Sequence, residues 1–251
     1  MVRLSAFILL TTALVYGQQP SLIIPHVADG GGWKTTIAVF NSFNGIPTRL
    51  SIVFRGPDGD KVALPVNNFG IRSSIDIDLE PSRSLFLETA GAGANVQTGW
   101  VEVQQFSGNE PVRGFAVFRQ SIPGKPDFEA VSMGMRAAAF MTFPFDNTSG
   151  MATSFGIVNL ASSACTIDVA PIFGESGVPV TPEIKLIGNL LPNGQISFLS
   201  TDRIPEMSNR RGYLTFRPHN SCAPGGLAML ALRFNPSGPF TNLLPLLAPS
   251  P

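Results

Sequence analysis

The sequence contains two similar halves, and this duplication constrains the fold more than any other feature. Residues 25–41, "PHVADGGGWKTTIAVFN", recur loosely as residues 144–159, "PFDNTSGMATSFGIVN". Later matches keep the same order and pair "LEPSRSLFLET" with "LLPNGQISFLST", "GWVEV" with "GYLTF" and "GFAVFRQ" with "MLALRFN". The aligned positions include Asp29 and Asn147, Gly32 and Gly150, Thr35 and Thr153, and Asn41 and Asn159. Each unit therefore covers about 115 residues, which is enough for a domain with its own core.

Within each unit, the hydrophobic residues follow the two-residue period of β-strands. The first unit shows this in "TTIAVFN", "RLSIVF", "SSIDIDL" and "WVEVQQF". Turn signals such as "GPDGD", "SGNEP" and "PGKP" separate these segments. In "SSIDIDL" the isoleucines and the aspartates point to opposite faces, so one face is buried and the other faces water. The pattern predicts an all-β fold with one β-sandwich in each unit.

The first residues have the pattern of a signal peptide. Arg3 precedes an apolar run over residues 6–15, and the small residue Gly17 follows it. This run is shorter than the roughly 20 residues of a membrane-spanning helix, and no second long apolar segment appears. We therefore predict a signal peptide over 1–17, a first sandwich over 18–133 and a second over 134–251. The mature chain is expected to have no membrane span and to be secreted, in a periplasm or outside the cell.

The chain carries few charges. Only 14% of its residues are charged and the formal net charge is zero. This balance gives no support to electrostatic binding of nucleic acid or of an acidic membrane. A neutral surface also has little charge repulsion against association, so the composition is compatible with self-association.

Cys165 and Cys222 are the only cysteines, and both lie in the second unit. In an oxidising compartment, an isolated pair of this kind favours a structural disulfide. The bridge would close a loop of nearly sixty residues, which stabilises a fold by about 4 kcal/mol in the chain-entropy model.

The "GGGWKTT" segment superficially resembles a phosphate-binding loop. Such a loop precedes a helix, whereas this one precedes a predicted strand, and its Lys34 has no counterpart in the second unit. The glycines favour a tight turn or a bulge. Gly31, Gly32 and Asp29 stay weak candidates for ligand binding together with the adjacent Trp33.

Calcium is the metal most compatible with the acidic turns. Asp29 with Asp146 and Asn147, or the turn "PDGD", offers oxygen ligands. Neither segment is a complete calcium-binding loop, and tight turns favour the same residues. We therefore predict no metal site and no cofactor.

Three aromatic residues are candidates for stacking on sugar rings. Trp100 and Tyr213 occupy matching places at the start of a central strand, which favours a buried packing role for both. Trp33 is matched by Met151 and lies beside flexible glycines. It is the better candidate for a surface site, with packing as the alternative.

No catalytic constellation is recognisable in the sequence. His26 and His219 are the only histidines, and no nucleophile turn accompanies either. An acid pair among Glu102, Glu110 and Glu129 would depend on spatial rather than sequence proximity. We therefore assign no catalytic residue and predict a protein that is not an enzyme.

The doubled "PHVADGGGWKT…VFN" and "FPFDNTSG…VN" segments resemble those of exported bacterial proteins of unknown function built from paired immunoglobulin-like sandwich repeats. The resemblance implies export and two tandem immunoglobulin-like β-sandwich domains, and it carries over no functional residue. The leading hypothesis is a secreted or envelope-associated, non-enzymatic interaction protein, whose partner is an envelope protein or extracellular polymer. Carbohydrate binding through the Trp33 loop and a hydrolase with an unrecognised acid pair are the alternatives.

Overall fold

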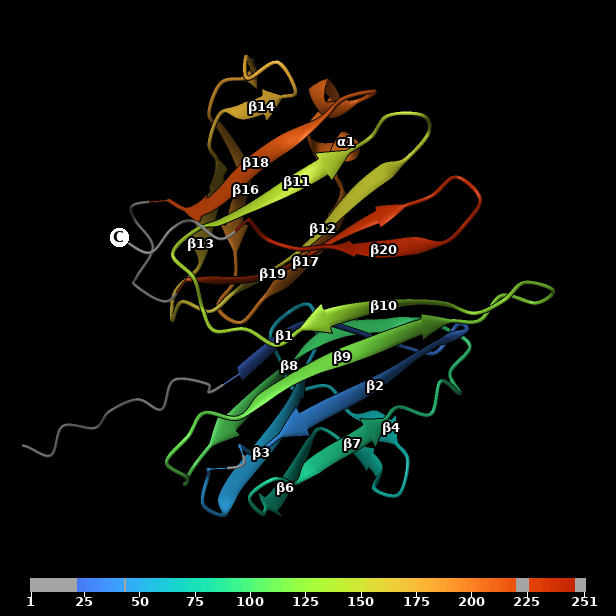
Figure 1. Cartoon of the computed structure of the whole chain (residues 1–251), viewed down its shortest axis with the longest axis vertical. Helices are drawn as coiled ribbons and strands as arrows, with labels where there is room; N and C mark the ends of the chain where they lie inside the picture. The colour runs from blue at the N-terminus through green and yellow to red at the C-terminus, as the bar shows by residue number, and fades with distance from the viewer. Residues whose placement is uncertain (1–21, 43, 220–225, 247–251) are drawn as a thin grey trace, which may run out of the picture.

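The computed structural model describes residues 22–42, 44–219 and 226–246. The predicted signal peptide and Cys222 lie outside these residues. Nearly all of the regular secondary structure in the described chain is β-strand, with one helical segment in which α1 (Ser200–Arg203) leads into the 3-10 turn η1 (Pro205–Met207). The predicted all-β fold class is confirmed. Strands β1 to β10 make up one half of the molecule and β11 to β20 the other, stacked along its long axis (Figure 1).

The first half contains two four-stranded antiparallel sheets. One has the order β1 (Leu22–Asp29), β8 (Gln97–Gln105), β3 (Thr48–Arg55), β6 (Ser74–Leu79), and the other the order β10 (Phe128–Met133), β9 (Arg113–Gln120), β2 (Trp33–Phe40), β7 (Ser84–Glu88). A short hairpin of β4 (Leu64–Val66) and β5 (Gly70–Arg72) is attached to them. Inward side chains of both sheets, including Ile37, Ile52, Phe54 and Val101, form one buried cluster, so this half is a sandwich.

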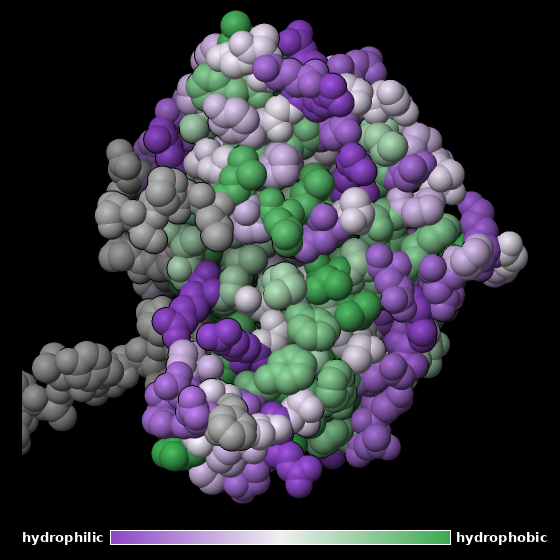
Figure 2. All heavy atoms as spheres, viewed as in Figure 1, coloured by the Kyte–Doolittle hydropathy of each residue, from purple (hydrophilic) through white to green (hydrophobic). Residues whose placement is uncertain are grey.

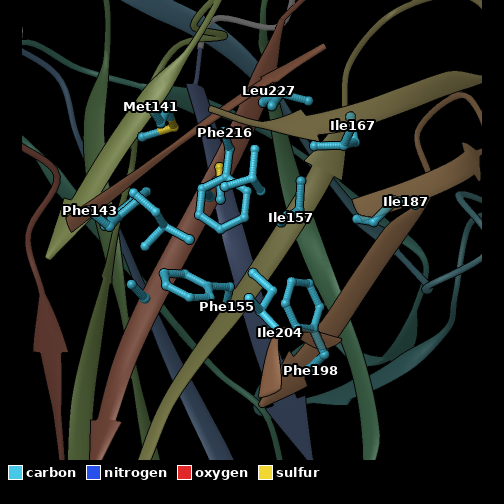
Figure 3. Close-up of a cluster of buried hydrophobic side chains, with 14 of the residues drawn as sticks. Met141, Phe143, Phe155, Ile157, Ile167, Ile187, Phe198, Ile204, Phe216 and Leu227 are labelled. Atoms are coloured by element: carbon cyan, nitrogen blue, oxygen red, sulfur yellow. The ribbon is translucent and has the colours of Figure 1, made fainter. Parts of the chain in front are cut away.

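The second half repeats this arrangement. Its sheets have the orders β11 (Met141–Asp146), β18 (Arg211–Pro218), β13 (Cys165–Val169), β16 (Ile184–Leu190) and β20 (Phe240–Leu243), β19 (Leu227–Phe234), β12 (Ala152–Asn159), β17 (Gln195–Leu199). Two short strands, β14 (Ile172–Gly174) and β15 (Pro179–Thr181), extend the first of these sheets beside β18. Phe143, Phe155 and Phe216 lie at the centre of its core (Figure 3).

Each of the eight main strands of the first sandwich, meaning the strands of its two four-stranded sheets, has a counterpart at the same place in the second. The short strands differ, because β4 and β5 form a separate two-stranded sheet whereas β14 pairs with β18. Both sandwiches pair their first strand with their sixth main strand, and their second strand with the fifth and the seventh. The topology therefore repeats in the same way as the sequence.

Matched threonines make the same buried hydrogen bonds in both sandwiches. The Thr35 hydroxyl donates to the Ala28 carbonyl at 2.7 Å and accepts from the Ala28 N–H at 3.0 Å. The Thr153 hydroxyl donates to the Asp146 carbonyl at 3.1 Å and accepts from the Asp146 N–H at 2.9 Å. Because a buried backbone group without a partner is costly, these threonines complete the pairing of each hairpin.

Matched asparagines likewise have equivalent partners. The Asn41 side-chain amide donates to the Leu79 carbonyl, and that of Asn159 to the Leu190 carbonyl, each at 2.9 Å. Both asparagines are buried. The polar residues that mark the repeat in the sequence are therefore structural.

The strand order differs from that of constant-type immunoglobulin domains. In those domains the first strand pairs with the second and the seventh with the sixth. Here the first strand pairs with the sixth main strand and the seventh with the second, although the pairs of strands two and five and of strands three and six are shared. The described chain therefore has a sandwich architecture with its own strand order, and the immunoglobulin-like assignment stays a proposal.

The two sandwiches pack together through an edge of the first and a face of the second (Figure 1). Strands β1 and β10 of the first sandwich lie against β12, β19 and β20. One hydrophobic cluster joins Ile23 and Trp100 to Val158 and Ala228. A second joins Phe118, Ala130, Leu230, Leu232 and Phe240. We call this contact the junction.

Buried hydrogen bonds fix the junction. The Gln195 side-chain amide donates to the carbonyls of Pro25 at 2.6 Å and Gly99 at 3.0 Å. The Trp100 indole N–H donates to the Asn193 carbonyl at 2.9 Å. Because these groups are removed from water, the two sandwiches are held in one relative position.

The prediction of a buried role for both Trp100 and Tyr213 was half right. Trp100 is fully buried, but in the junction rather than between its own two sheets. Tyr213 is 41% exposed and stacks on Phe173, so the prediction was wrong for this residue. The reason is that no second sandwich lies on the corresponding part of the second copy.

Candidate functional site

The three glycines form a tight turn between β1 and β2. Gly30 and Trp33 exchange two backbone hydrogen bonds of 2.9 Å around Gly31 and Gly32, whose φ angles are +57° and +84°. Positive φ at both central residues is the I′ turn that fits a hairpin. A Cβ atom at any of the three glycines would also collide with a neighbouring loop. The geometry is that of a turn, as predicted.

Asp29 and Lys34, which flank this turn, are both bound to protein groups. Asp29 is buried and accepts a 2.7 Å hydrogen bond from the Gly91 N–H. Lys34 pairs with Glu88 across the sheet. This hydrogen bond holds the pKa of Glu88 below its usual value. Ligand binding at Asp29, Gly31 and Gly32 stays a prediction.

Trp33 lies at the junction and is half-buried. Its ring centroid is 5.5 Å from that of Phe240 and 6.1 Å from that of Phe118. These contacts suit the packing alternative, while carbohydrate binding through Trp33 stays a prediction.

His26 also lies at the junction, where β1 contains an extra residue. Ile24 pairs with Val101 and Val27 with Gly99, so residues 25 and 26 form a bulge that β11 lacks. The bulge accounts for the one residue by which the first copy exceeds the second in this segment. It places His26 in a cavity of about 190 Å³ at the junction.

His26 is half-buried. It packs edge-on against Phe118, with ring centroids 5.4 Å apart, and it lines the cavity. Burial lowers the pKa of His26 to about 4. The ring is therefore neutral at physiological pH.

The groups considered for catalysis do not meet at one place. His219 contacts Asp168, with Nδ1 and Oδ2 2.6 Å apart. Glu102 is buried and paired with Arg55 at 2.5 Å. Within the described ranges, no group of three or more His, Cys, Asp or Glu side chains is placed to hold a metal ion.

Cys165 is buried at the start of β13. Its predicted partner Cys222 lies outside the described residues, so the disulfide between them stays a prediction.

One face of the first sandwich presents apolar side chains to solvent. The outward residues of β2, β7, β9 and β10 include Phe40, Phe86, Phe115, Val117, Val131 and Met133. We call this surface the open face. The Phe40 ring stacks on Phe115, with centroids 5.8 Å apart, and meets Phe86 edge-on at 6.0 Å. Phe86 is 60% exposed and Met133 46% exposed.

Figure 2 shows this hydrophobic surface over β9 and β2, in the lower half of the view. Charged residues border it: Arg113 is exposed, and Arg119 pairs with Asp127 at 3.4 Å. A hydrophobic patch with a polar border is typical of an interaction surface.

Most of the corresponding face of the second sandwich is buried in the junction, although Ser197 and Leu199 on β17 are exposed. Its outward hydrophobic residues include Val158, Ala228, Leu230, Leu232, Phe234 and Phe240. We call this surface the covered face. Strand register places Phe40 and Phe115 of the open face at the positions of Val158 and Leu230. The same sheet face is therefore apolar in both copies, but only one copy is covered by the other.

The open face continues toward the junction. Met133, at the end of β10, is also part of the wall of an apolar cavity of about 300 Å³ between the sandwiches. Phe143, Met229 and the half-buried Leu243 line the same cavity. The hydrophobic surface therefore connects with the interface that the chain already forms.

A separate groove of about 590 Å³ lies between the β8–β9 loop and residues 136–137, in the segment that joins β10 to β11. Its wall includes Ser107, Asn109, Glu110 and Arg136, together with the exposed Phe106. Unlike the open face, this groove is therefore lined by several polar and charged side chains.

Comparisons with known proteins identify no family. No family model matches the chain, and no curated protein matches it. Among solved structures, the chain is similar to a putative secreted protein from Parabacteroides distasonis. The TM-score is 0.24 and the sequence identity 14%, over 84% of this chain and 75% of that one. No helix in the described part of the chain is long and apolar enough to cross a membrane.

The open face was not predicted, although the sequence contains a signal for it. "GFAVF" in β9 and "LAMLAL" in β19 are apolar at both alternating positions. A strand in contact on both faces reads as a continuous apolar run. The apolar residues at the outward positions of these strands, Phe115 and Leu230, indicate a second contact surface.

Proposed function

We propose that this protein is a secreted or envelope-associated, non-enzymatic interaction protein that binds its partner through the open face. The observation that carries the proposal is the cluster of Phe40, Phe86 and Phe115 on this face. Phe40 and Phe115 correspond to Val158 and Leu230, which are buried against the first sandwich, and Phe86 is 60% exposed beside them. Aromatic side chains supply much of the binding free energy in protein interfaces.

The mechanism is passive. The strands hold the three rings in fixed positions on a sheet, so little conformational entropy is lost when a partner covers them. Hydrogen bonds from Gln195 to β1 and β8, and from Trp100 to Asn193, join the second sandwich to the opposite sheet of the first and leave the open face free.

The proposal includes the assignments that accompany export. Residues 1–17 are the signal peptide, and residues 18–133 and 134–251 are two immunoglobulin-like domains. Cys165 and Cys222 form a disulfide after export.

The test is co-sedimentation of the mature chain (residues 18–251) with purified envelope fractions. Phe86→Glu places a charge on the edge strand β7 of the open face, next to the Phe40 ring, and we expect it to weaken binding at least about tenfold. Ile71→Glu is the matched control, because Ile71 is a 68% exposed hydrophobic residue on β5, outside the open face. Unchanged binding by Phe86→Glu, or an equal loss with Ile71→Glu, contradicts the proposal.

Carbohydrate binding is the second candidate function. The polar groove with the exposed Phe106 has the combination of hydrogen-bonding groups and an aromatic ring that suits a sugar. Saturable binding to insoluble polysaccharides that Phe106→Ala or Trp33→Ala abolishes, while Phe86→Glu retains it, would favour this function instead.

A further inference from the structure

At the junction, an apolar sheet face of the second sandwich is covered by an edge of the first. Its contributing edge belongs to the first sandwich and includes the Pro25 carbonyl on β1 and the Trp100 side chain on β8. The receiving surface is the covered face of the second sandwich. The open face is the topological equivalent of this receiving surface, and no described residue of the chain packs over Phe86 in the same way.

The second sandwich has its own version of the contributing edge. Tyr213 corresponds to Trp100 in the repeat and lies opposite Pro144, which corresponds to Pro25. Tyr213 is 41% exposed, whereas Trp100 is fully buried, and it stacks on the half-buried Phe173 at 5.3 Å. We call Pro144, Phe173 and Tyr213 the Tyr213 edge.

Gly99 and Gly212, which precede these two aromatic residues, share one packing role. A Cβ atom at Gly99 would collide with the Arg55 carbonyl, and one at Gly212 with the Phe173 carbonyl. In both sandwiches the glycine lets the neighbouring strand approach closely and leaves the following aromatic ring on the outer surface. The two edges are therefore built alike, but only the first is in contact with a face.

We propose that the open face of one molecule receives the Tyr213 edge of a second copy of this chain. This inference rests on the proposed function, because it names the partner of the same face. Met133 connects the open face to the junction cavity, so the new contact would extend an interface that already exists. The zero formal net charge opposes such association little.

The two surfaces of this contact are different, so the association is head-to-tail. A head-to-tail contact leaves one face and one edge free after each addition, and it forms either a ring or an open chain of molecules. A symmetric dimer would instead pair one surface with itself.

The test is sedimentation velocity of the mature chain over a range of concentrations. We expect the unmodified protein and the Ile71→Glu control to form species larger than dimers. Phe86→Glu loses the face and Tyr213→Glu loses the edge, so each alone should associate at least about tenfold more weakly. An equimolar mixture of the two variants should form a 1:1 dimer and nothing larger, because one intact face and one intact edge remain.

Other outcomes overturn the inference. A monomer at every concentration would do so, and so would a dimer that Phe86→Glu abolishes but Tyr213→Glu leaves intact. If Tyr213→Glu does not fold, as judged by circular dichroism, Tyr213→Ser is the milder substitution at the edge. A monomeric protein whose envelope binding depends on Phe86 would preserve the proposed function and refute self-association.

Discussion

The open face and the covered face occupy the same place in two copies of one sandwich, yet one is exposed and the other buried. Strand register aligns Phe40 with Val158 and Phe115 with Leu230. The covered face also has two phenylalanines, but at the positions of the Phe40–Phe115 cluster it has Val158, Leu230 and the small Gly156, which allow an edge to pack closely. The open face has larger rings that pack on one another. Apolar character therefore belongs to the repeat, whereas burial depends on what lies next to each copy.

The largest expected effect comes from the aromatic residues of the two edges. Trp100→Ala should lower the free energy of unfolding by about 3–5 kcal/mol, because it leaves a cavity in the junction. Tyr213→Ala should lower the free energy of unfolding by less than about 1 kcal/mol, since Tyr213 is exposed. Chemical denaturation followed by circular dichroism measures both. Equal losses would mean that the two edges are not in different environments.

The next expected effect is a pH dependence of stability that comes from His26. It concerns only the first copy, because the second copy has the single residue Pro144 where the first has the Pro25–His26 bulge. The pKa of His26 is lowered from 6.5 to about 4 by burial. Between these values the unfolded chain binds a proton that the folded chain excludes, so stability falls as the pH falls from 6.5 to 4. The loss is at most about 3 kcal/mol.

Thermal unfolding at a series of pH values tests this expectation, with His26→Gln as the matched variant. The variant should lose less stability than the unmodified protein between pH 6.5 and 4. Carboxylates such as Asp146 contribute to acid unfolding of both proteins. Desolvation opposes ionisation of Asp146, but hydrogen bonds from Thr148 and Arg233 hold its pKa below the usual value. Parallel pH profiles would refute the role of His26.

A smaller effect distinguishes Gln195 from Ser84, which strand register places at the same position of the two faces. Gln195→Leu should lower the free energy of unfolding by about 1–3 kcal/mol, because the Pro25 and Gly99 carbonyls lose the hydrogen bonds from the Gln195 side-chain amide. Ser84→Leu should change stability by less than about 0.5 kcal/mol, since Ser84 is exposed. The denaturation midpoints of the two variants give the comparison, and a stable Gln195→Leu protein would show that the junction does not depend on these bonds.

Much of the fold could be predicted from the sequence, because local patterns determine it. The alternation in "SSIDIDL" places Ile75 inside and Asp76 outside, as the structure has them. The repeated Thr35 and Thr153 mark the same hairpin bonds in both copies. The glycines before Trp33 predicted a turn for the reason that the structure shows, namely positive φ.

The site residues were harder to predict, because their environment depends on contacts between distant parts of the chain. Trp100 and Tyr213 look equivalent in the sequence, and only the position of the second sandwich makes one buried and the other exposed. Asp29 resembled a ligand residue, but its partner Gly91 is 62 positions away along the chain. The extra residue beside His26 can be seen by comparing the lengths of the two repeated segments. That comparison does not show that the residue lies in the junction.

By itself, the sequence determined an all-β chain, its duplication, its turns and the inward residues of each strand, because each of these follows from neighbouring residues and a two-residue period. The tertiary structure alone decided that an edge of the first sandwich lies on a face of the second, and that the equivalent face of the first stays open. Side-chain alternation specifies that a face is apolar, but it carries no information about which surface packs on that face.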